Sequence, residues 1–391
     1  MALVLVRVCL IGVSVGTVSA SAQTGSFIAT LGTDTLQIER FERTGDRFTG
    51  IVVTRSPLTR VMRYTLTVTS AGHPLRYEIT TLRADGTPLR HNGAAGSITW
   101  HSDSVTRETL RDGTLTSQRI ATPESVIPGP GVPFLGTPFL LYELAHAQAR
   151  RAAAGGPESA WHLLTMNAQQ MQPQRVKVWL VGADSAESDY FGVARIGHRF
   201  NARGQLLRSD WSQSTYKYAV RRGTDIDVLA LAREWDARDR AGKAVGPLSL
   251  PDTVRATIGS ANLTVTYSRP AKRGRVIWGA LVTWDQVWRL GADYATHLTT
   301  TADLTIGNHV LPAGRYTLWM LPSQHGESML IINSRTNIFG TQYSPTTDVV
   351  RIPLERAPRR EMVERLSLAV ENDRLWIRWD DAEYSAPIAV R

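Results

Sequence analysis

From Thr35 to about residue 86, apolar and polar residues alternate with a period of two in short segments. Tyr64, Leu66 and Val68 alternate with threonines, and residues 76–82 follow the same pattern. Successive side chains of a β-strand point to opposite faces of a sheet, so this pattern predicts strands with one buried face and one solvated face. Turn signals at 72–74 and 85–86 separate the strands. The pattern therefore predicts an antiparallel meander.

Two segments depart from this pattern and predict helices. The first covers residues 139–150 and follows Pro138, whose fixed φ suits a first helical turn. The second covers about residues 224–240 and places three apolar residues on one face, namely Val228, Leu231 and Trp235. Further strands are expected at 175–181, 189–196 and 206–211, with a hairpin turn at 201–204 and a proline-rich interruption at 127–133.

The C-terminal third predicts a second β-structure. Strands are expected at 253–258, 261–270, 272–279, 316–321, 328–333, 366–371 and 375–379. Glycines and prolines between them mark tight turns, and many short strands at this spacing are typical of a β-sandwich. The expected fold class is therefore mainly β, with an N-terminal antiparallel meander sheet that carries one or two helices and a C-terminal β-sandwich.

The length of 391 residues exceeds what one hydrophobic core usually organises. The segment 242–250 is rich in Gly and Pro and is expected to be a linker. The predicted organisation is a signal peptide at 1–22, an N-terminal β-rich domain with crossing helices at 23–241, this linker, and the sandwich at 251–391.

The first 22 residues are typical of a secretory signal peptide. Residues 3–18 are nearly all apolar or small, and Ala20-Ser21-Ala22 forms a small-x-small cleavage site before Gln23. We therefore expect a periplasmic or extracellular protein. The only cysteine, Cys9, lies in this segment, so the mature chain can form neither disulfides nor thiolate metal sites. No later stretch is apolar enough for a transmembrane segment.

The charge of the chain changes this picture little. Lys and Arg number 44 against 35 Asp and Glu, which leaves a net charge of +9. The basic residues are scattered, with no run of five, whereas binding to nucleic acid phosphates requires clustered cations. We therefore expect no nucleic acid partner.

The succession of meander, apolar helix and second meander is similar in architecture to the half-barrel lipid carriers of bacterial envelopes. In those proteins a curved sheet wraps around a helix and leaves an apolar cavity. The resemblance implies a lipid ligand for the N-terminal region, and the alternative is a core that side chains fill.

Five motifs of the C-terminal third identify a second resemblance. In order they are Tyr267-Ser268-Arg269-Pro270, Lys272-Arg273-Gly274-Arg275, Trp288-Arg289-Leu290-Gly291-Ala292, Pro312-Ala313-Gly314-Arg315-Tyr316-Thr317-Leu318 and Ile332-Asn333. This region, roughly Leu250 to Arg391, resembles the domain of unknown function 2911 family. The resemblance implies an all-β secreted domain and brings no catalytic residue. Where this chain has Asp293, the family tends to have Asn.

Six residues near the expected turns of this region form the candidate binding site: Arg269, Arg275, Trp288, Arg289, Asp293 and His297. An Arg guanidinium can bind a carboxylate, a phosphate or a sugar acid through two hydrogen bonds, and Trp288 could stack on a sugar ring. The alternative is structural, with Arg289 paired to Asp293 or Asp285 and Trp288 filling the core.

The sequence contains no signature of catalysis or of a cofactor. The nine histidines include no His-x-His or His-Glu-x-x-His motif, and neither a Gly-x-Ser-x-Gly elbow nor a phosphate loop is present. We therefore expect no metal and no cofactor. The leading hypothesis is non-catalytic binding of a lipid, a glycan or an envelope protein. The alternative is an envelope hydrolase that uses Arg289, Asp293 and His297.

Overall fold

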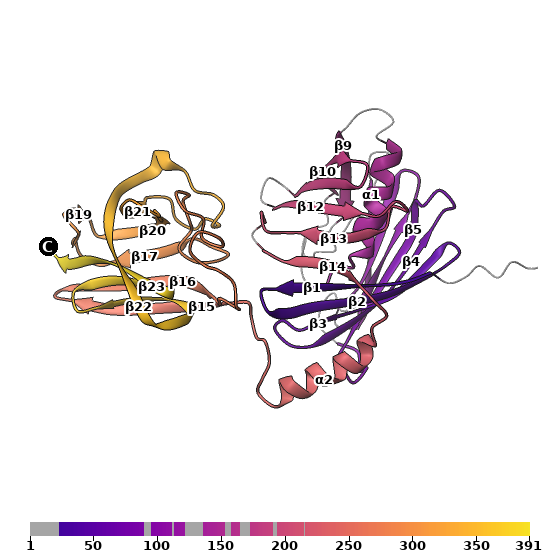
Figure 1. Ribbon diagram of the computed structural model, residues 1–391, viewed down its shortest axis with the longest axis horizontal. Helices are drawn as coiled ribbons and strands as arrows, with labels where there is room; N and C mark the ends of the chain where they lie inside the picture. The colour runs from indigo at the N-terminus through magenta and orange to yellow at the C-terminus, as the bar shows by residue number, and fades with distance from the viewer. Residues whose placement is uncertain are drawn as a thin grey trace, which may run out of the picture.

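The computed structural model describes residues 23–89, 95–111, 113–121, 136–152, 158–164, 173–190, 194–214 and 216–391. The predicted signal peptide with Cys9, and the proline-rich segment 127–133, lie outside these residues. Figure 1 shows two β-rich domains that are joined after helix α2 (Val228–Arg240). Neither described helix is long and apolar enough to cross a membrane.

The N-terminal domain is one antiparallel sheet of 14 strands in the order β8-β7-β6-β5-β4-β3-β2-β1-β14-β13-β12-β11-β10-β9. Two meanders, β1 to β8 and β9 to β14, therefore join where β1 pairs with β14. The strands are β1 (Gln23–Leu31), β2 (Asp34–Thr44), β3 (Arg47–Thr54), β4 (Arg60–Val68), β5 (Pro74–Leu82), β6 (Ala95–Trp100), β7 (Ser104–Arg111), β8 (Thr114–Ala121), β9 (Glu158–Leu164), β10 (Pro173–Gly182), β11 (Ser185–Tyr190), β12 (Ala194–Phe200), β13 (Leu206–Asp210) and β14 (Ala219–Gly223).

The predicted meander is confirmed, and one predicted strand is wrong. The alternation at 64–68 and 76–82 lies in β4 and β5, where buried and less buried residues alternate as expected. The hairpin turn is also present, because the Gly204 amide donates to the carbonyl of Asn201. The single strand predicted at 189–196 is instead the end of β11 and the start of β12. A continuous run of apolar side chains hides that boundary in the sequence.

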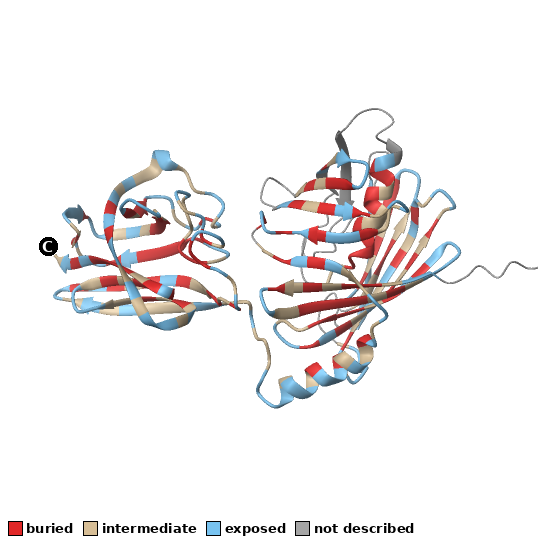
Figure 2. Ribbon diagram, viewed as in Figure 1, coloured by how far each residue is buried: buried red, intermediate tan, exposed pale blue. Residues whose placement is uncertain are grey.

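Helix α1 (Leu140–Ala152) lies against the inner face of the curved sheet, as Figure 1 shows. Leu140, Ala145 and Ala149 are fully buried there. The same core contains aromatic rings from both meanders, among them Phe27, Phe41, Tyr142 and Trp211. In the described part of this domain, α1 and the strands around it therefore share one core, and Figure 2 shows buried residues on both.

Helix α2 covers part of the opposite, outer face of the sheet. Val228 and Trp235 pack on Ile38, Val53 and Val61. The helix begins about four residues later than the sequence indicates, because the side chain of Asp227 caps it by accepting hydrogen bonds from the amides of residues 229 and 230.

The C-terminal domain has nine strands in the order β15-β16-β17-β20-β21-β22-β23-β18-β19. They are β15 (Ser249–Ile258), β16 (Ala261–Pro270), β17 (Thr296–Thr300), β18 (Leu304–Ile306), β19 (His309–Leu311), β20 (Gly314–Leu321), β21 (Ser328–Asn333), β22 (Asp348–Glu371) and β23 (Arg374–Val390). The first half of β22 pairs with β21, and its second half lies beside β16, where Leu368 donates its amide hydrogen to the Tyr267 hydroxyl. The sheet thereby folds over one core, which confirms the predicted sandwich.

The strand predicted at 272–279 is wrong. Residues 272–292 form turns and isolated bridges between β16 and β17. Arg273 and Gly274 both have positive φ, at 51° and 69°, which no extended strand allows. Because residues 272–292 do not form a strand, their side chains do not alternate between two faces, and several polar ones face the N-terminal domain.

Candidate functional site

A cleft of about 500 Å³ lies between the two domains. Its C-terminal wall includes four of the six residues selected from the sequence, namely Arg275, Trp288, Arg289 and Asp293. Its N-terminal wall is the turn between β13 and β14, with Tyr216, Lys217 and Tyr218. The volume lies in the range of small-molecule binding sites.

Tryptophan rings support the C-terminal wall. The ring of Trp288 stacks on that of Trp379, with centroids 5.8 Å apart, and meets Trp278 edge-on at 6.2 Å. The Trp288 backbone also pairs with Met320 of β20. Trp379 is fully buried, whereas Trp288 is only partly buried and lines the cleft. Trp288 is therefore both a packing residue and a surface that a ligand can touch.

Arg289 is the least satisfied cation of the cleft. Its side chain passes over Gly340, where an added Cβ atom would lie 2.1 Å from the Arg289 Cδ atom. Among the residues that the structure describes, the guanidinium makes no hydrogen bond and no ion pair within 4 Å. Burial lowers the pKa of Arg289, and the nearby charge of Asp293 opposes that shift. The ion pairs from Arg289 to Asp293 or Asp285 that the structural alternative requires are thus not formed.

Lys217 brings a second partly buried cation to the cleft from the other domain. Its ammonium group donates to the carbonyl of Ser212 at 2.6 Å. Burial lowers the pKa of Lys217, and the charges of Arg289 and Arg275 lower it further, against a weaker opposing effect of Asp210. The charges of Arg289 and Arg275 therefore disfavour the protonated form of Lys217, and the one carboxylate among the lining residues is Asp293.

Two tyrosines complete the N-terminal wall. The rings of Tyr216 and Tyr218 stack with centroids 5.8 Å apart. Burial raises the pKa of Tyr216 to about 12, and the charge of Asp293 adds to this effect. Burial also raises the pKa of Tyr218, so both hydroxyls stay protonated near neutral pH and can act as neutral donors.

The backbone of the cleft is locally strained. Lys217, Leu290 and Asp293 have φ between 51° and 59°, a region that residues with a Cβ atom rarely adopt. Such residues persist where surrounding contacts hold them, and they cluster at functional sites. Here the Asp293 carbonyl accepts a hydrogen bond from the Gly340 amide, and the Leu290 carbonyl accepts one from the Thr296 hydroxyl.

The other selected residues have structural contacts. Arg275 lines the cleft, but its guanidinium donates to the carbonyls of Lys272 and Ala271. Arg269 lies outside the cleft, where it donates to the Leu366 carbonyl and pairs with Asp252 at 3.2 Å. His297 is buried in β17, and its Nε2 atom accepts a hydrogen bond from the Asn337 amide. Of the three residues of the hydrolase hypothesis, Arg289 and Asp293 line the cleft and His297 does not.

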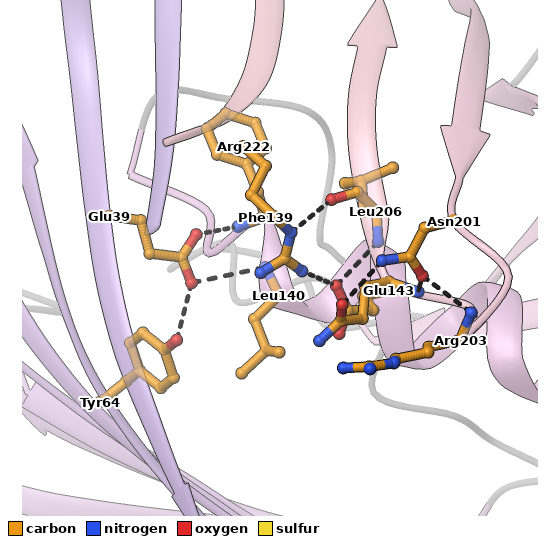
Figure 3. Close-up of polar contacts among 10 residues, drawn as sticks. Glu39, Tyr64, Phe139, Leu140, Glu143, Asn201, Arg203, Leu206 and Arg222 are labelled. Atoms are coloured by element: carbon orange, nitrogen blue, oxygen red, sulfur yellow. Dashed lines mark hydrogen bonds and ion pairs between the residues drawn. The ribbon is translucent and has the colours of Figure 1, made fainter. Parts of the chain in front are cut away.

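A buried polar network also holds helix α1 in the N-terminal domain (Figure 3). Glu39 of β2 accepts hydrogen bonds from the Tyr64 hydroxyl at 2.7 Å and from the Phe139 amide at 2.5 Å. Burial raises the pKa of Glu39 to about 7. One turn further along the helix, Glu143 pairs with Arg222 of β14. This network caps and anchors the helix, and no sequence motif indicates it.

Within the described ranges, no three His, Cys, Asp or Glu side chains are placed to hold a metal ion.

Comparisons with known proteins concern each domain separately. Residues 249–388 match the family described as protein of unknown function (DUF2911). This match confirms the resemblance of the C-terminal third. A crystal structure of a DUF1089 family protein from Pseudomonas aeruginosa is similar to the N-terminal part, with 12% sequence identity and a TM-score of 0.34. The aligned region covers 45% of the present chain and 90% of the Pseudomonas aeruginosa chain. None of the curated proteins matches the chain.

Proposed function

We propose that this protein is exported through a cleaved signal peptide and binds a small anionic molecule, without reacting with it, in the cleft between its two domains. The proposal rests on one observation about Arg289, which lines the cleft. In the described structure its guanidinium makes no hydrogen bond and no ion pair. A partly buried charge without a partner is unfavourable, and a bound carboxylate or phosphate would satisfy it.

The surroundings of Arg289 specify the ligand further. Lys217 and Arg275 add positive charge, so an anion would offset the repulsion that, in addition to burial, lowers the pKa of Lys217. Trp288 and Tyr216 offer flat surfaces to the rest of the molecule. A sugar acid or another small carboxylate with one apolar face has this combination of properties.

Isothermal titration calorimetry of the mature chain with galacturonate and with citrate tests this proposal. Substitution Arg289→Ala should weaken binding of the better ligand by about tenfold or more, because a hydrogen-bonded charge typically contributes 1.5–3 kcal/mol. Arg289→Lys should retain part of the affinity, since the charge remains and the forked geometry is lost.

Arg255→Ala is the matched control, because Arg255 is exposed on β15 away from the cleft. It removes the same charge and should leave the affinity unchanged. Equal loss of affinity in the two variants would indicate general electrostatic attraction and would contradict a specific role for Arg289. No binding of either anion to the wild type would count against the proposed ligand class.

A further inference from the structure

Three arginines lie in register across three neighbouring strands of the N-terminal sheet. Arg199 of β12 is directly opposite Arg208 of β13, and Arg208 is directly opposite Arg221 of β14. The residues next to them, His198, Ser209 and Val220, are buried toward α1. Since side chains alternate along a strand, the three exposed arginines share the outer face of the sheet. Helix α2 covers a different part of that face, over β2 and β3.

Such a row is unfavourable on its own. Directly opposed side chains of an antiparallel pair lie about 5 Å apart at Cβ, and like charges in that position destabilise the sheet. Arg199 is partly neutralised by Asp184, at 3.0 Å. In the described part of the chain, Arg208 and Arg221 have no ion pair and no side-chain hydrogen bond. This face therefore presents two opposed guanidinium groups without a counter-charge.

The nearby carboxylates interact with other groups. Glu187 pairs with Arg195 of the neighbouring strand. Asp210 accepts a hydrogen bond from the Ser212 amide at 2.8 Å, and Asp225 pairs with Arg40. None of them lies within 4 Å of the guanidinium of Arg208 or Arg221.

A hollow of about 600 Å³ lies beside the row. Gly197 and Ala219 line it, and an added Cβ atom at Gly197 would meet no atom within 4 Å. Arg199, Arg208 and Arg221 are also among its lining residues. The small residues therefore leave room for a molecule next to the guanidinium groups, which a full-sized side chain at either position would reduce.

We propose that Arg208 and Arg221 form a second binding site, which holds the phosphate group of a phosphorylated ligand. Each guanidinium can offer two parallel N–H donors to a phosphate, so one oxyanion can bridge both side chains. The strand spacing makes the full row about 10 Å long, which suits a ligand with two adjacent phosphates better than one with a single phosphate. A soluble pyrophosphate compound and a lipid headgroup share this chemistry.

Titration of the mature chain with inorganic pyrophosphate at low ionic strength tests the site. The double variant R208Q/R221Q should bind pyrophosphate about tenfold more weakly than the wild type. R255Q/R315Q removes two exposed arginines of the other domain and should bind like the wild type.

Sedimentation with vesicles of phosphatidylcholine, with and without phosphatidic acid, distinguishes the two sources of phosphate. Binding to the phosphatidic acid vesicles that pyrophosphate displaces supports the site with a lipid headgroup as ligand. Binding of pyrophosphate alone supports it with a soluble ligand. Affinity of R208Q/R221Q within twofold of the wild type, or no binding of either probe to the wild type, overturns the proposal.

Thermal unfolding gives a readout that does not depend on the ligand. Without phosphate, R208Q/R221Q should melt at the same or a higher temperature than the wild type, because the substitution removes repulsion between opposed charges. A lower melting temperature would show that the arginines stabilise the sheet and would contradict their assignment to a ligand.

Discussion

Asp34 and Arg273 form an ion pair that connects the two domains. Arg273 is only 7% exposed, and its backbone carbonyl also accepts a hydrogen bond from the Thr33 amide at 3.0 Å. Gly32 touches the same carbonyl so closely that an added Cβ atom would lie 1.9 Å from it. Leu31, which immediately precedes this turn, lines the cleft. The contact therefore fixes the distance between the two walls of the proposed site.

Substitution Asp34→Asn should loosen this contact. It leaves the buried Arg273 charge without its carboxylate, and breaking such a pair is destabilising even where one partner is partly exposed. We expect a larger radius of gyration by small-angle X-ray scattering, with each domain still folded. Asp46→Asn, at the exposed β2–β3 turn, is the control. An unchanged scattering profile for Asp34→Asn would mean that other contacts hold the domains.

Glu39 should make stability depend on pH. Its pKa rises from 4.5 to about 7 on folding, so the folded chain retains a proton that the unfolded chain releases in this range. The free energy of unfolding should therefore decrease as pH rises from about 4.5 to 7, by about 3 kcal/mol for this one group. This decrease in the free energy of unfolding should be complete above pH 7.

Urea denaturation of Glu39→Gln between pH 4.5 and 8 measures this effect. The neutral amide cannot titrate, so the stability of the variant relative to the wild type should increase with pH over this interval. Glu42→Gln, on the same strand, should show no such trend. If the free energy of unfolding of Glu39→Gln varied with pH in parallel with that of the wild type, the raised pKa of Glu39 would be contradicted.

His198 should have the opposite effect in acid. Its ring lies between the hydroxyls of Ser188 at 2.8 Å and Ser209 at 2.9 Å, and burial lowers its pKa to about 3. The unfolded chain binds the proton first, near pH 6.5, so this group should reduce the free energy of unfolding by about 1.4 kcal/mol per pH unit as pH falls from there toward 3.

Guanidinium denaturation of His198→Gln across this range is the measurement. The variant should lose less stability in acid than the wild type, although it starts from a lower value because the amide fills less space. His73→Gln, at an exposed turn, should retain the wild-type acid slope. The same slope in His198→Gln as in the wild type would show that other groups cause the acid sensitivity.

Gly340→Ala should disturb the cleft without changing its charge. The new methyl group would lie 2.1 Å from Arg289 Cδ and 2.7 Å from the Asp293 carbonyl oxygen, so the arginine must move. We expect about a tenfold loss of affinity for the ligand of the cleft, together with a destabilisation of about 1–3 kcal/mol. Gly326→Ala is the control, because its methyl group would meet only the side chain of Ser323. It should change neither the affinity for the cleft ligand, measured by calorimetry, nor the free energy of unfolding.

The sequence predicts the fold better than the site because strand patterning is local. Alternation at 64–68 reports directly on the two faces of β4. The boundary between β11 and β12 was missed because apolar residues run through it. Glu39 was missed for a different reason: it lies on a strand, and only the tertiary fold brings the first turn of α1, about a hundred residues away, to its carboxylate.

Half of the proposed cleft could be predicted. Arg275, Trp288, Arg289 and Asp293 were selected because polar residues beside turns collect at one end of a sandwich. The N-terminal wall with Tyr216 and Lys217 was not, since no periodicity relates the β13–β14 turn to a connection that lies some 70 residues further along the chain. Contacts between domains leave no pattern in a single sequence.

Native mass spectrometry of the mature protein, purified from its own cells, tests the binding proposal most directly. The wild type should retain a small anionic molecule in a one-to-one complex, and solvent extraction should release it for identification. Arg289→Ala should be purified without that molecule, whereas Arg255→Ala should retain it. An empty wild type, or the same molecule retained by Arg289→Ala, would contradict ligand binding in the cleft.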